Sequence, residues 1–330
     1  MHESSTVFDL IVLGSGPSGL TASLYASRAF LNVLVIAGES SGGQLAMTSD
    51  IENFPGFPEG VTGSELVSNM RKQAEKYGAK FIDESAKQIS GSFEENFSVQ
   101  TVSGNVYLSK SVIVATGASA KWLGLESEQK LIGRGVSACA TCDGFFFKDK
   151  VIAVVGGGDS AMEEATFLTR FASKVYLLVR GDKENLRASK VMQKKAFENA
   201  KVEFLFNTQV KEVLGENFVE GLKISTKVIE EGVEVEKENI LDDVRGLFVA
   251  IGHKPNTDFL NGFIELDEKG YVKVFGGCKT SKEGVFVSGD VHDHVYKQAI
   301  SAAGFGCMAA IDAIRFLASH GVGIDTSQYD

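Results

Sequence analysis

The chain has 330 residues, 44% of them hydrophobic and 23% charged, which is enough for two globular domains with separate cores. A net charge of −10 argues against a surface that binds nucleic acid, and four cysteines are too few for a secreted disulfide scaffold. There is no basic signal region, and no apolar segment approaches the ~20 residues of a membrane helix, so we expect a cytoplasmic protein that binds no membrane.

The first predicted elements are a buried strand at residues 8–13 and a helix that ends near Ala29. Between them lies the turn Gly14-Ser15-Gly16-Pro17-Ser18-Gly19, and a second strand at residues 33–37 ends close to Glu39. This order of strand, G-x-G-x-x-G, helix, strand and acid is typical of a dinucleotide-binding fold, because its glycines let a pyrophosphate approach the helix N-terminus. We predict an ADP-containing cofactor here; an ordinary tight turn between strand and helix is the alternative.

A polar and aromatic loop follows, and its length and composition indicate that it faces a ligand. It contains Gly42-Gly43-Gln44 and Asn53-Phe54-Pro55-Gly56-Phe57-Pro58. A helix is predicted near residues 64–77. The β-rich stretch after it ends at Ala115-Thr116-Gly117, which resembles the turn that closes many flavin-binding domains.

Cys139 and Cys142 form a Cys-x-x-Cys pair that is followed directly by Asp143 and then by three phenylalanines. Because the pair lies just before a second dinucleotide-binding turn, we interpret it as a dithiol that receives electrons from a bound cofactor. Only a thiolate attacks a disulfide, so an adjacent acid is useful for exchanging protons. A turn role in Asp-Gly is the alternative for Asp143, and a zinc site with His292 and His294 is the alternative for the cysteines.

The second glycine turn, Gly156-Gly157-Gly158-Asp159-Ser160-Ala161, follows a strand at residues 151–155 and opens a helix expected to run from about Ser160 to Phe171. The next strand ends at Arg180, where an acid would accept from a free ribose 2′-hydroxyl and an arginine suits a 2′-phosphate. Arg187 is a second candidate for this phosphate, so NADPH is preferred over NADH. The alternative is that both arginines are solvated surface residues.

The rest of the chain is predicted to begin with a strand and an antiparallel meander over residues 202–238. A strand at 247–252 leaves the second domain, and another at 285–287 precedes Gly289-Asp290. A helix from about residue 298 to 318 carries small residues that permit close packing. Two cysteines have no signature partner and are expected to be small buried residues, namely Cys278 and Cys307.

Together these motifs resemble the low-molecular-weight thioredoxin reductases, in which the Cys-x-x-Cys pair lies just upstream of the second fingerprint. The resemblance covers essentially the whole chain and includes Gly-Gly-Gln-Leu, Ala-Thr-Gly-Ala-Ser-Ala and Gly-Arg-Gly-Val-Ser-Ala-Cys-Ala-Thr-Cys-Asp-Gly-Phe-Phe. It implies an α/β protein with two Rossmann-like dinucleotide-binding domains of three-layer ββα type, the second inserted into the first. The expected FAD-binding domain comprises residues 1–118 and 251–330, and the expected NADPH-binding domain comprises residues 119–250 and carries the dithiol.

The resemblance also implies a homodimeric thioredoxin-disulfide reductase. Electrons are expected to pass from NADPH to FAD, then to the Cys139–Cys142 disulfide, and finally to oxidised thioredoxin. Cys142 resembles the cysteine that faces the flavin, Cys139 the one that attacks the partner disulfide, and Asp143 the acid that exchanges protons with the dithiol.

Further residues are assigned to cofactors and partner by the same resemblance. Asp290 resembles the acid that binds the flavin ribityl chain, and Lys297-Gln298-Ala299 resembles the helix N-terminus beside the flavin pyrimidine edge. The residues assigned to FAD are Gly14, Ser15, Gly16, Pro17, Gly19, Glu39, Gly43, Gln44, Asn53, Thr116, Gly117, Gly289, Asp290, Lys297, Gln298 and Ala299. Those assigned to NADPH are Gly156, Gly157, Gly158, Asp159, Ser160, Arg180 and Arg187. Those that resemble thioredoxin-docking residues are Arg134, Phe145 and Phe146, with core packing as the alternative for Phe145.

Two departures from the family pattern are visible. The usual consecutive arginines are reduced to Arg180-Gly181, and a longer spacer that contains Glu184 precedes Arg187. This predicts a weaker preference for NADPH than is usual in the family. Lys297 replaces a common arginine and keeps its charge without its forked geometry.

A single dithiol must meet both the flavin and a protein partner. The family resolves this by rotating the NADPH domain about hinges, which correspond here to residues near 118–121 and 251–253. One rival interpretation is a reductase with the same core and another donor or acceptor, such as ferredoxin, a peroxidase module or a small dithiol. The other is a non-catalytic flavoprotein that binds partners, against which the intact Cys-x-x-Cys-Asp motif weighs.

Overall fold

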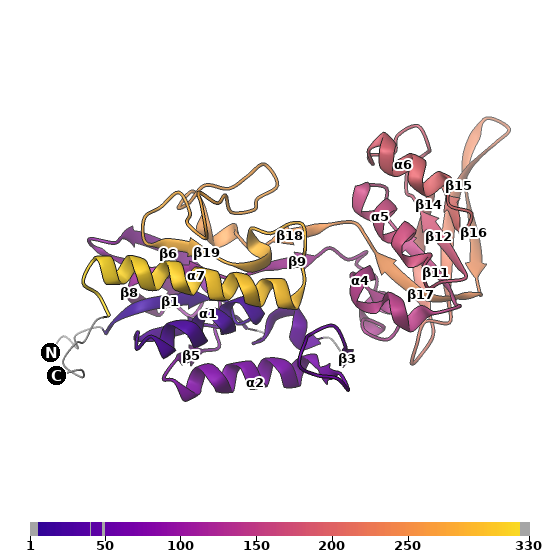
Figure 1. Cartoon of the computed structure of the whole chain (residues 1–330). Helices are drawn as coiled ribbons and strands as arrows, with labels where there is room; N and C mark the ends of the chain where they lie inside the picture. The colour runs from indigo at the N-terminus through magenta and orange to yellow at the C-terminus, as the bar shows by residue number, and fades with distance from the viewer. Residues whose placement is uncertain (1–5, 40, 48–49, 324–330) are drawn as a thin grey trace. The chain divides into compact units, whose positions relative to one another are not determined.

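The computed structural model describes residues 6–39, 41–47 and 50–323. The chain divides into two compact units, a first unit of residues 1–119 and 254–330 and a second unit of residues 120–253 (Figure 1). The expected domain limits, 118 and 250, differ from these junctions by one residue and three residues. The chain crosses the junctions through β9 (Ala118–Ala120) and β18 (His253–Pro255), which pair with each other.

The first unit is built on a seven-stranded sheet in the order β5-β2-β1-β8-β7-β6, with β19 also paired to β8. Its parallel strands contain short apolar runs, such as residues 10–13, 33–36, 112–114 and 285–287, as expected when both faces of a sheet are covered. The strands are β1 (Val7–Leu13), β2 (Val33–Ile36), β5 (Lys80–Ile82), β6 (Ala86–Ser92), β7 (Asn96–Thr101), β8 (Val106–Val114) and β19 (Val285–Val287).

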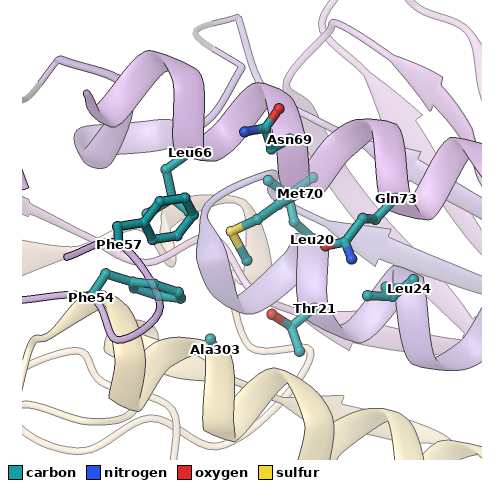
Figure 2. Close-up of a pocket in the computed structure, with 10 residues that line it drawn as sticks. All are labelled: Leu20, Thr21, Leu24, Phe54, Phe57, Leu66, Asn69, Met70, Gln73 and Ala303. Carbon is teal, nitrogen blue, oxygen red and sulfur yellow. The ribbon is translucent and has the colours of Figure 1, made fainter. Parts of the chain in front are cut away.

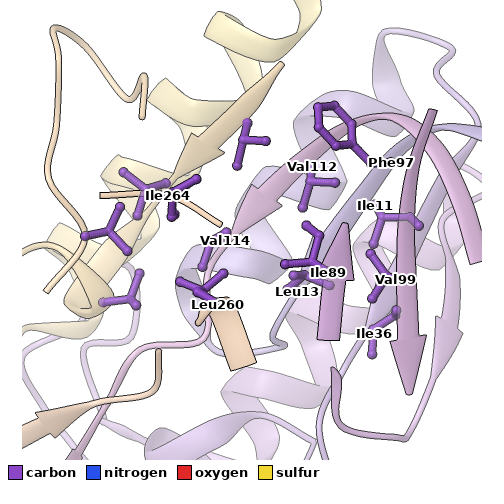
Figure 3. Close-up of a cluster of buried hydrophobic side chains, with 14 of the residues drawn as sticks. Ile11, Leu13, Ile36, Ile89, Phe97, Val99, Val112, Val114, Leu260 and Ile264 are labelled. Carbon is purple, nitrogen blue, oxygen red and sulfur yellow. The ribbon is translucent and has the colours of Figure 1, made fainter. Parts of the chain in front are cut away.

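Alternate side chains of these strands enter two cores. Leu10 and Val12 of β1 pack with alanines of α1 (Pro17–Arg28) and α7 (Ala299–Ser319). Ile11 and Leu13 of the same strand point to the other face, where they join Leu260 and further residues of β6, β7 and the C-terminal segment (Figure 3). The remaining elements of this unit are η1 (Gly43–Met47), β3 (Asp50–Ile51), β4 (Val61–Thr62), α2 (Gly63–Lys76), η3 (Asp258–Leu260) and η4 (Gly289–Val291).

The length of helix α7 differs from what was expected of the apolar segments in the sequence. Among the described residues it is the one helix long and apolar enough to cross a membrane, with 21 residues and a mean hydropathy of 1.5. The expectation that no apolar segment approaches this length is therefore wrong, because alanines and glycines build the helix. Here Ala309, Ala310 and Leu317 are buried against the sheet of the first unit, as in the core helix of a folded domain (Figure 1).

The second unit has three layers. A five-stranded sheet in the order β10-β17-β11-β12-β13 carries helices on one face and the antiparallel sheet β14-β15-β16 on the other. Along β12, Val175 and Leu177 face the helices, while Tyr176 and Leu178 face the smaller sheet. The predicted strand and meander after residue 202 are thus present, and the predicted fold class, α/β with one Rossmann-like domain inserted into another, is confirmed.

The strands of the second unit's large sheet are β10 (Val136–Ser137), β11 (Val151–Val155), β12 (Lys174–Leu178), β13 (Val202–Leu205) and β17 (Val244–Val249). The smaller sheet contains β14 (Thr208–Leu214), β15 (Gly221–Glu230) and β16 (Val233–Leu241). The helices are α3 (Glu126–Lys130), α4 (Ala140–Asp143), η2 (Gly144–Phe147), α5 (Asp159–Leu168) and α6 (Lys190–Phe197). Helix α5 ends earlier than predicted, because the N–H groups of Phe171 and Ala172 both turn back to the Leu168 carbonyl.

Candidate active site and cofactor sites

The glycine turn of the first unit connects β1 to α1. A methyl group on Gly19 would overlap the Gly14 carbonyl oxygen, and one on Gly14 would overlap the Ala115 carbonyl oxygen. Beside Gly16 there is no atom within 4 Å of such a methyl group. The outer glycines are therefore required by the packing of the turn, and the space at Gly16 is left for a ligand.

Several segments from distant parts of the sequence meet at this turn. The Ser15 hydroxyl donates to the Ala37 carbonyl at 2.7 Å and accepts from the Gly42 N–H at 2.8 Å. A methyl group on Gly43 would lie 3.7 Å from Gly16 Cα. The Ser18 hydroxyl donates to Ser288, directly before Gly289. The N-terminus of α1, which begins with Pro17 at its first helical position, is thus the centre of the predicted FAD residues.

Asn256 is a functional candidate that the sequence analysis missed. Its side-chain amide donates to the Thr116 carbonyl at 2.9 Å, and its backbone N–H donates to the Gly117 carbonyl at 3.0 Å. The Thr116 hydroxyl donates to the Asn256 carbonyl at 2.8 Å, and the Ser119 hydroxyl donates to Oδ1 of Asn256 at 3.0 Å. Asn256 therefore holds the turn at Thr116-Gly117, and no local signal in the sequence identifies a partner 140 residues away.

The polar loop and the start of α7 are also connected. Gln44 of η1 donates its side-chain amide to the Ala118 carbonyl, and Asn53 donates to Oε1 of Gln298 at 3.4 Å. Gln298 is the N-cap residue of α7, so Ala299 is its first helical residue, and Lys297 has a positive φ of 49°. Glu39 is exposed, three residues beyond the last residue of β2.

Asp290 is a buried carboxylate in η4. Its Oδ1 atom is shielded from solvent and has no hydrogen-bond partner within the described chain. Burial, together with the neighbouring Asp293 carboxylate, raises the pKa of Asp290 to about 6. A buried acceptor of this kind is completed by a hydroxyl donor, and the ribityl chain of FAD supplies such hydroxyls. The unpartnered Oδ1 atom of Asp290 and the open space at Gly16 are both compatible with bound FAD.

A separate cavity of about 190 Å³ lies in the first unit between α1, α2, the 54–57 loop and α7 (Figure 2). Its walls are apolar apart from the side chains of Thr21, Asn69 and Gln73, and they include none of the predicted site residues. The rings of Phe54 and Phe57 lie on one side of it, with centroids 6.3 Å apart.

The dithiol lies in the second unit. Cys139 and Cys142 are joined by a disulfide across the single turn of α4, with Cα atoms 5.3 Å apart. Both residues are half-buried. The Cys142 N–H donates to Sγ of Cys139 at 3.2 Å, and the Thr141 hydroxyl lies 3.4 Å from the same sulfur. Hydrogen bonds to a sulfur stabilise a thiolate, so these contacts are compatible with the predicted role of Cys139 as the attacking sulfur.

Asp143 lies directly beside the disulfide and is half-buried. Burial raises the pKa of its carboxyl group, while a hydrogen bond from Ser137 opposes that shift. Ser137 also accepts from the Cys139 N–H at 2.9 Å, so this residue, which the sequence analysis missed, contacts both the acid and the cysteine backbone. A carboxylic acid with a raised pKa keeps its proton to a higher pH than an ordinary aspartate, which is compatible with the predicted exchange of protons with the dithiol.

The second glycine turn connects β11 to α5. A methyl group on Gly156 would overlap the Ala250 carbonyl oxygen and would lie 2.7 Å from Cβ of Ala161, whereas one on Gly158 meets nothing within 4 Å. Ser160 lies in the first turn of α5, and the Asp159 carboxylate accepts from the Ser189 N–H at 2.7 Å. The space at Gly158 and the two adjacent helix N-termini fit a dinucleotide pyrophosphate.

Arg180 and Arg187 belong to two segments that pack on this turn. The N–H groups of Arg187 and Ala188 both donate to the Gly157 carbonyl at 3.1 Å. A methyl group on Gly157 would lie 3.1 Å from Val179 and 3.7 Å from Leu186, the residues that precede the two arginines. Both arginines are exposed, and Arg180 directly follows the carboxyl end of β12, where a Rossmann fold places the ribose 2′ position.

Three residues predicted to dock a partner lie near the dithiol in sequence. Phe145 and Phe146 of η2 have exposed fractions of 62% and 42%, and Arg134 is exposed. Phe147 is buried and packs edge-to-face on Phe248, with ring centroids 5.2 Å apart. The run of three phenylalanines therefore divides into two surface residues and one core residue.

Within the described residues, no group of three or more His, Cys, Asp or Glu side chains is placed to hold a metal ion. The His292 ring packs on Phe305 with centroids 4.6 Å apart, and His294 lies near the Tyr271 ring. Cys278 is buried as expected, but Cys307 is only half-buried, because it lies toward the outer side of α7.

Comparisons with known proteins agree with this geometry. A model of the pyridine nucleotide-disulphide oxidoreductase family matches residues 8–306. A thioredoxin reductase of Mycolicibacterium smegmatis is 49% identical over 321 residues, which cover 96% of this chain and 99% of that protein. One from Streptomyces coelicolor is 50% identical, with coverages of 96% and 95%. The solved structure of thioredoxin reductase from Streptococcus pyogenes is 37% identical, with a TM-score of 0.87 over 96% of this chain and 100% of that chain.

Proposed function

The chain belongs to the pyridine nucleotide-disulphide oxidoreductase family, and we propose that its site residues make it a thioredoxin-disulfide reductase that uses NADPH and FAD. The observation that carries this proposal is the Cys139–Cys142 disulfide, half-buried beside an acid with a raised pKa, in a unit that also has a dinucleotide turn. An FAD-type turn with a buried, unpartnered carboxylate occupies the other unit.

The first unit supplies the FAD residues. The turn from Gly14 to Gly19 receives the pyrophosphate, Glu39 the adenosine ribose, and Asp290 a ribityl hydroxyl. Lys297 and Gln298 at the start of α7 would hold the flavin ring, and the helix N-terminus there would stabilise negative charge on it. When bound, FAD accepts a hydride from NADPH and delivers the electron pair to a disulfide. In the second unit the turn from Gly156 to Ser160 receives the NADPH pyrophosphate, and Arg180 and Arg187 receive its 2′-phosphate.

The cysteines carry out the thiol–disulfide exchange, and Asp143 transfers the protons. Two electrons and two protons convert the Cys139–Cys142 disulfide to a dithiol. The Cys139 thiolate then attacks the thioredoxin disulfide, forming a mixed disulfide and releasing one thioredoxin thiolate, which takes up a proton. Cys142 attacks Cys139 in turn, restores the enzyme disulfide and releases the second thioredoxin thiol. Asp143 takes the proton from the attacking thiol and returns one when the disulfide is next reduced.

The two half-reactions require different surroundings for one disulfide. We propose that the second unit rotates on the first about residues 118–121 and 251–253, so that the dithiol alternates between the flavin and thioredoxin. The paired strands β9 and β18 support this hinge, because they are the two places where the chain passes between the units. A crosslink between the units that leaves turnover intact would refute the rotation.

The protein is further proposed to be a cytoplasmic homodimer that binds no membrane. Exposed apolar side chains on α1 and α7, namely Tyr25, Ile300 and Met308, support a second copy on that face of the first unit. A reducing cytoplasm also suits a disulfide that is reduced in every catalytic cycle.

The test is NADPH oxidation by the purified flavoprotein with thioredoxin and a terminal disulfide, alongside Cys142→Ser. We expect turnover that requires thioredoxin and that is lost in the variant. Flavin reduction without thioredoxin turnover would point to another acceptor, and no flavin reduction by NADPH would refute the donor assignment.

A further inference from the structure

An aromatic strip continues from the dithiol across the surface of the second unit. The strip consists of Phe145 of η2, Phe171 in the turn after α5, and Phe167 in the last turn of α5. The Phe145 and Phe171 rings meet edge-to-face with centroids 6.4 Å apart, and the Phe171 and Phe167 rings do so at 5.6 Å. Each ring therefore contacts the next, and the strip forms one continuous surface.

The strip begins at the dithiol itself. Phe145 follows Cys142 by three residues in consecutive helical turns, which is about 5 Å along the helix axis. A methyl group on Gly144 would lie 3.1 Å from the Phe171 ring, so this turn packs directly on the strip. Helix α4 also contacts α5.

The far end of the strip is cationic. The Arg170 guanidinium lies over the Phe167 ring, 5.1 Å from its centroid, and is exposed. Lys148 and Lys150 are exposed near the other end, between η2 and β11. Acids also lie close in sequence: Asp143 and Asp149 flank η2, and the exposed Glu163 and the half-buried Glu164 precede Phe167 by about one helical turn. A partner with an apolar patch and a carboxylate that reaches Arg170 fits this surface.

We infer that the surface that receives oxidised thioredoxin extends from the dithiol over Phe145, Phe171 and Phe167 to Arg170. The inference rests on the proposed function, since thioredoxin must bring its disulfide into contact with Cys139. An interface of ordinary size covers about 800 Å² per partner, a disc of about 16 Å radius, and this disc includes the strip. Phe145 is exposed and packs edge-to-face on the half-buried Phe171, which suits an interface anchor, and the cation at the far end of the strip sets the orientation.

The test is the steady-state kinetics of the full-length FAD-loaded enzyme with thioredoxin as the varied substrate. Arg170→Glu leaves the core untouched, and we expect it to raise the KM for thioredoxin roughly fivefold to tenfold with a weaker salt dependence. Phe167→Leu keeps an apolar side chain and is expected to raise this KM roughly threefold. Lys195→Glu, which makes the same charge change on the exposed face of α6, is the matched control.

A second readout separates docking from structural damage. The rate of flavin reduction by NADPH, measured without thioredoxin, is expected to be unchanged in Arg170→Glu and Phe167→Leu. The inference is overturned if both variants match wild type in their KM for thioredoxin, or if Lys195→Glu raises it as much as Arg170→Glu. A wild-type enzyme that reduces its flavin but never turns over thioredoxin would overturn the proposed function and this inference with it.

Discussion

Each of the two glycine turns of this protein connects a strand to a helix, but the two turns differ in which positions have no room for a side chain. In the first unit the third glycine, Gly19, is required because a methyl group would overlap the Gly14 carbonyl oxygen. In the second unit the corresponding residue is Ala161, and the close contact is accommodated by Gly156, which has a φ of 152°. Both turns thus need a glycine at their first position, where Gly14 and Gly156 face the carbonyl oxygens of Ala115 and Ala250, whereas the need for glycine at the last position depends on how the helix meets the strand.

The surroundings of the turns differ as well. The first turn is enclosed by the segments around Thr116, Gly289 and Gln298, and it has a buried carboxylate at Asp290. The second turn is bordered by the exposed Arg180 and Arg187. An enclosed site with a buried acceptor suits a cofactor that stays bound, and an open, cationic site suits a nucleotide that exchanges in every cycle.

Gly19→Ala is expected to have the largest effect on the packing of the first turn. Because the new methyl group overlaps backbone rather than a flexible side chain, we expect a loss of roughly 3 kcal/mol or more in the free energy of unfolding, with most of the FAD content lost. Thermal unfolding and flavin absorbance measure both quantities. Gly16→Ala is the matched control: its methyl group meets no protein atom, so apo-protein stability should change by about 1 kcal/mol or less while FAD binding still weakens. Equal stability of the two variants would contradict the packing argument.

Asp290→Asn tests the buried acceptor. Removing the charge should weaken FAD binding roughly tenfold, measured by titration of the apo-protein, because a charged acceptor forms the stronger hydrogen bond.

The same variant is expected to change how the free energy of unfolding depends on pH. The folded-state pKa of Asp290, about 6, lies above its ordinary value of 3.8, so the folded protein holds this proton more tightly than the unfolded chain. Its favourable contribution is complete below about pH 4 and is lost as the pH rises through 6, on the order of 2 to 3 kcal/mol. Unfolding of apo wild type and apo Asp290→Asn should therefore diverge between pH 4 and pH 6, in favour of the variant. Parallel pH curves would contradict the burial of this carboxylate.

Arg180→Ala and Arg187→Ala test whether the open second site recognises the 2′-phosphate of NADPH. Each should lower kcat/KM for NADPH roughly tenfold and leave kcat/KM for NADH within about twofold, because only NADPH carries the 2′-phosphate. If wild type uses NADH and NADPH equally well, the assignment of this clamp is wrong.

Ala161→Gly has the smallest expected effect. The added backbone freedom in the first turn of α5 should cost about 1 kcal/mol of unfolding free energy, with no change in the KM for NADPH beyond about twofold. A stabilised variant would show that Cβ of Ala161 is strained against Gly156.

Local patterns predicted much of this architecture. Both glycine turns, their helices and the Cys-x-x-Cys segment lie where the sequence places them, because strand, turn and helix are adjacent in the chain. Asn256 and Ser137 were missed for a physical reason: their importance comes from hydrogen bonds to Thr116 and to the Cys139 backbone, and neither residue type is distinctive in its own segment.

The length of the apolar segment in α7 and the burial of Cys307 were both predicted wrongly, and the packing of α7 explains both. The helix has 21 residues and is apolar mainly through alanines and glycines, which are less conspicuous in a sequence than large apolar side chains. It is buried along one side only. Cys307 lies off the buried side and is half-exposed. Which side of a uniformly small-residue helix faces the core depends on its neighbours, Leu10 and Ala22 among them, rather than on its own pattern.

The proposed electron relay depends most directly on which cysteine attacks thioredoxin. The probe is a thioredoxin with one cysteine, carried as a disulfide with a coloured aromatic thiol, so that attack releases the colour and leaves a stable enzyme–thioredoxin disulfide. We expect reduced Cys142→Ser to form this adduct through Cys139, and Cys139→Ser to form it at least tenfold more slowly, as measured by mass spectrometry and colour release. An adduct that forms mainly through Cys142 would contradict the assigned roles.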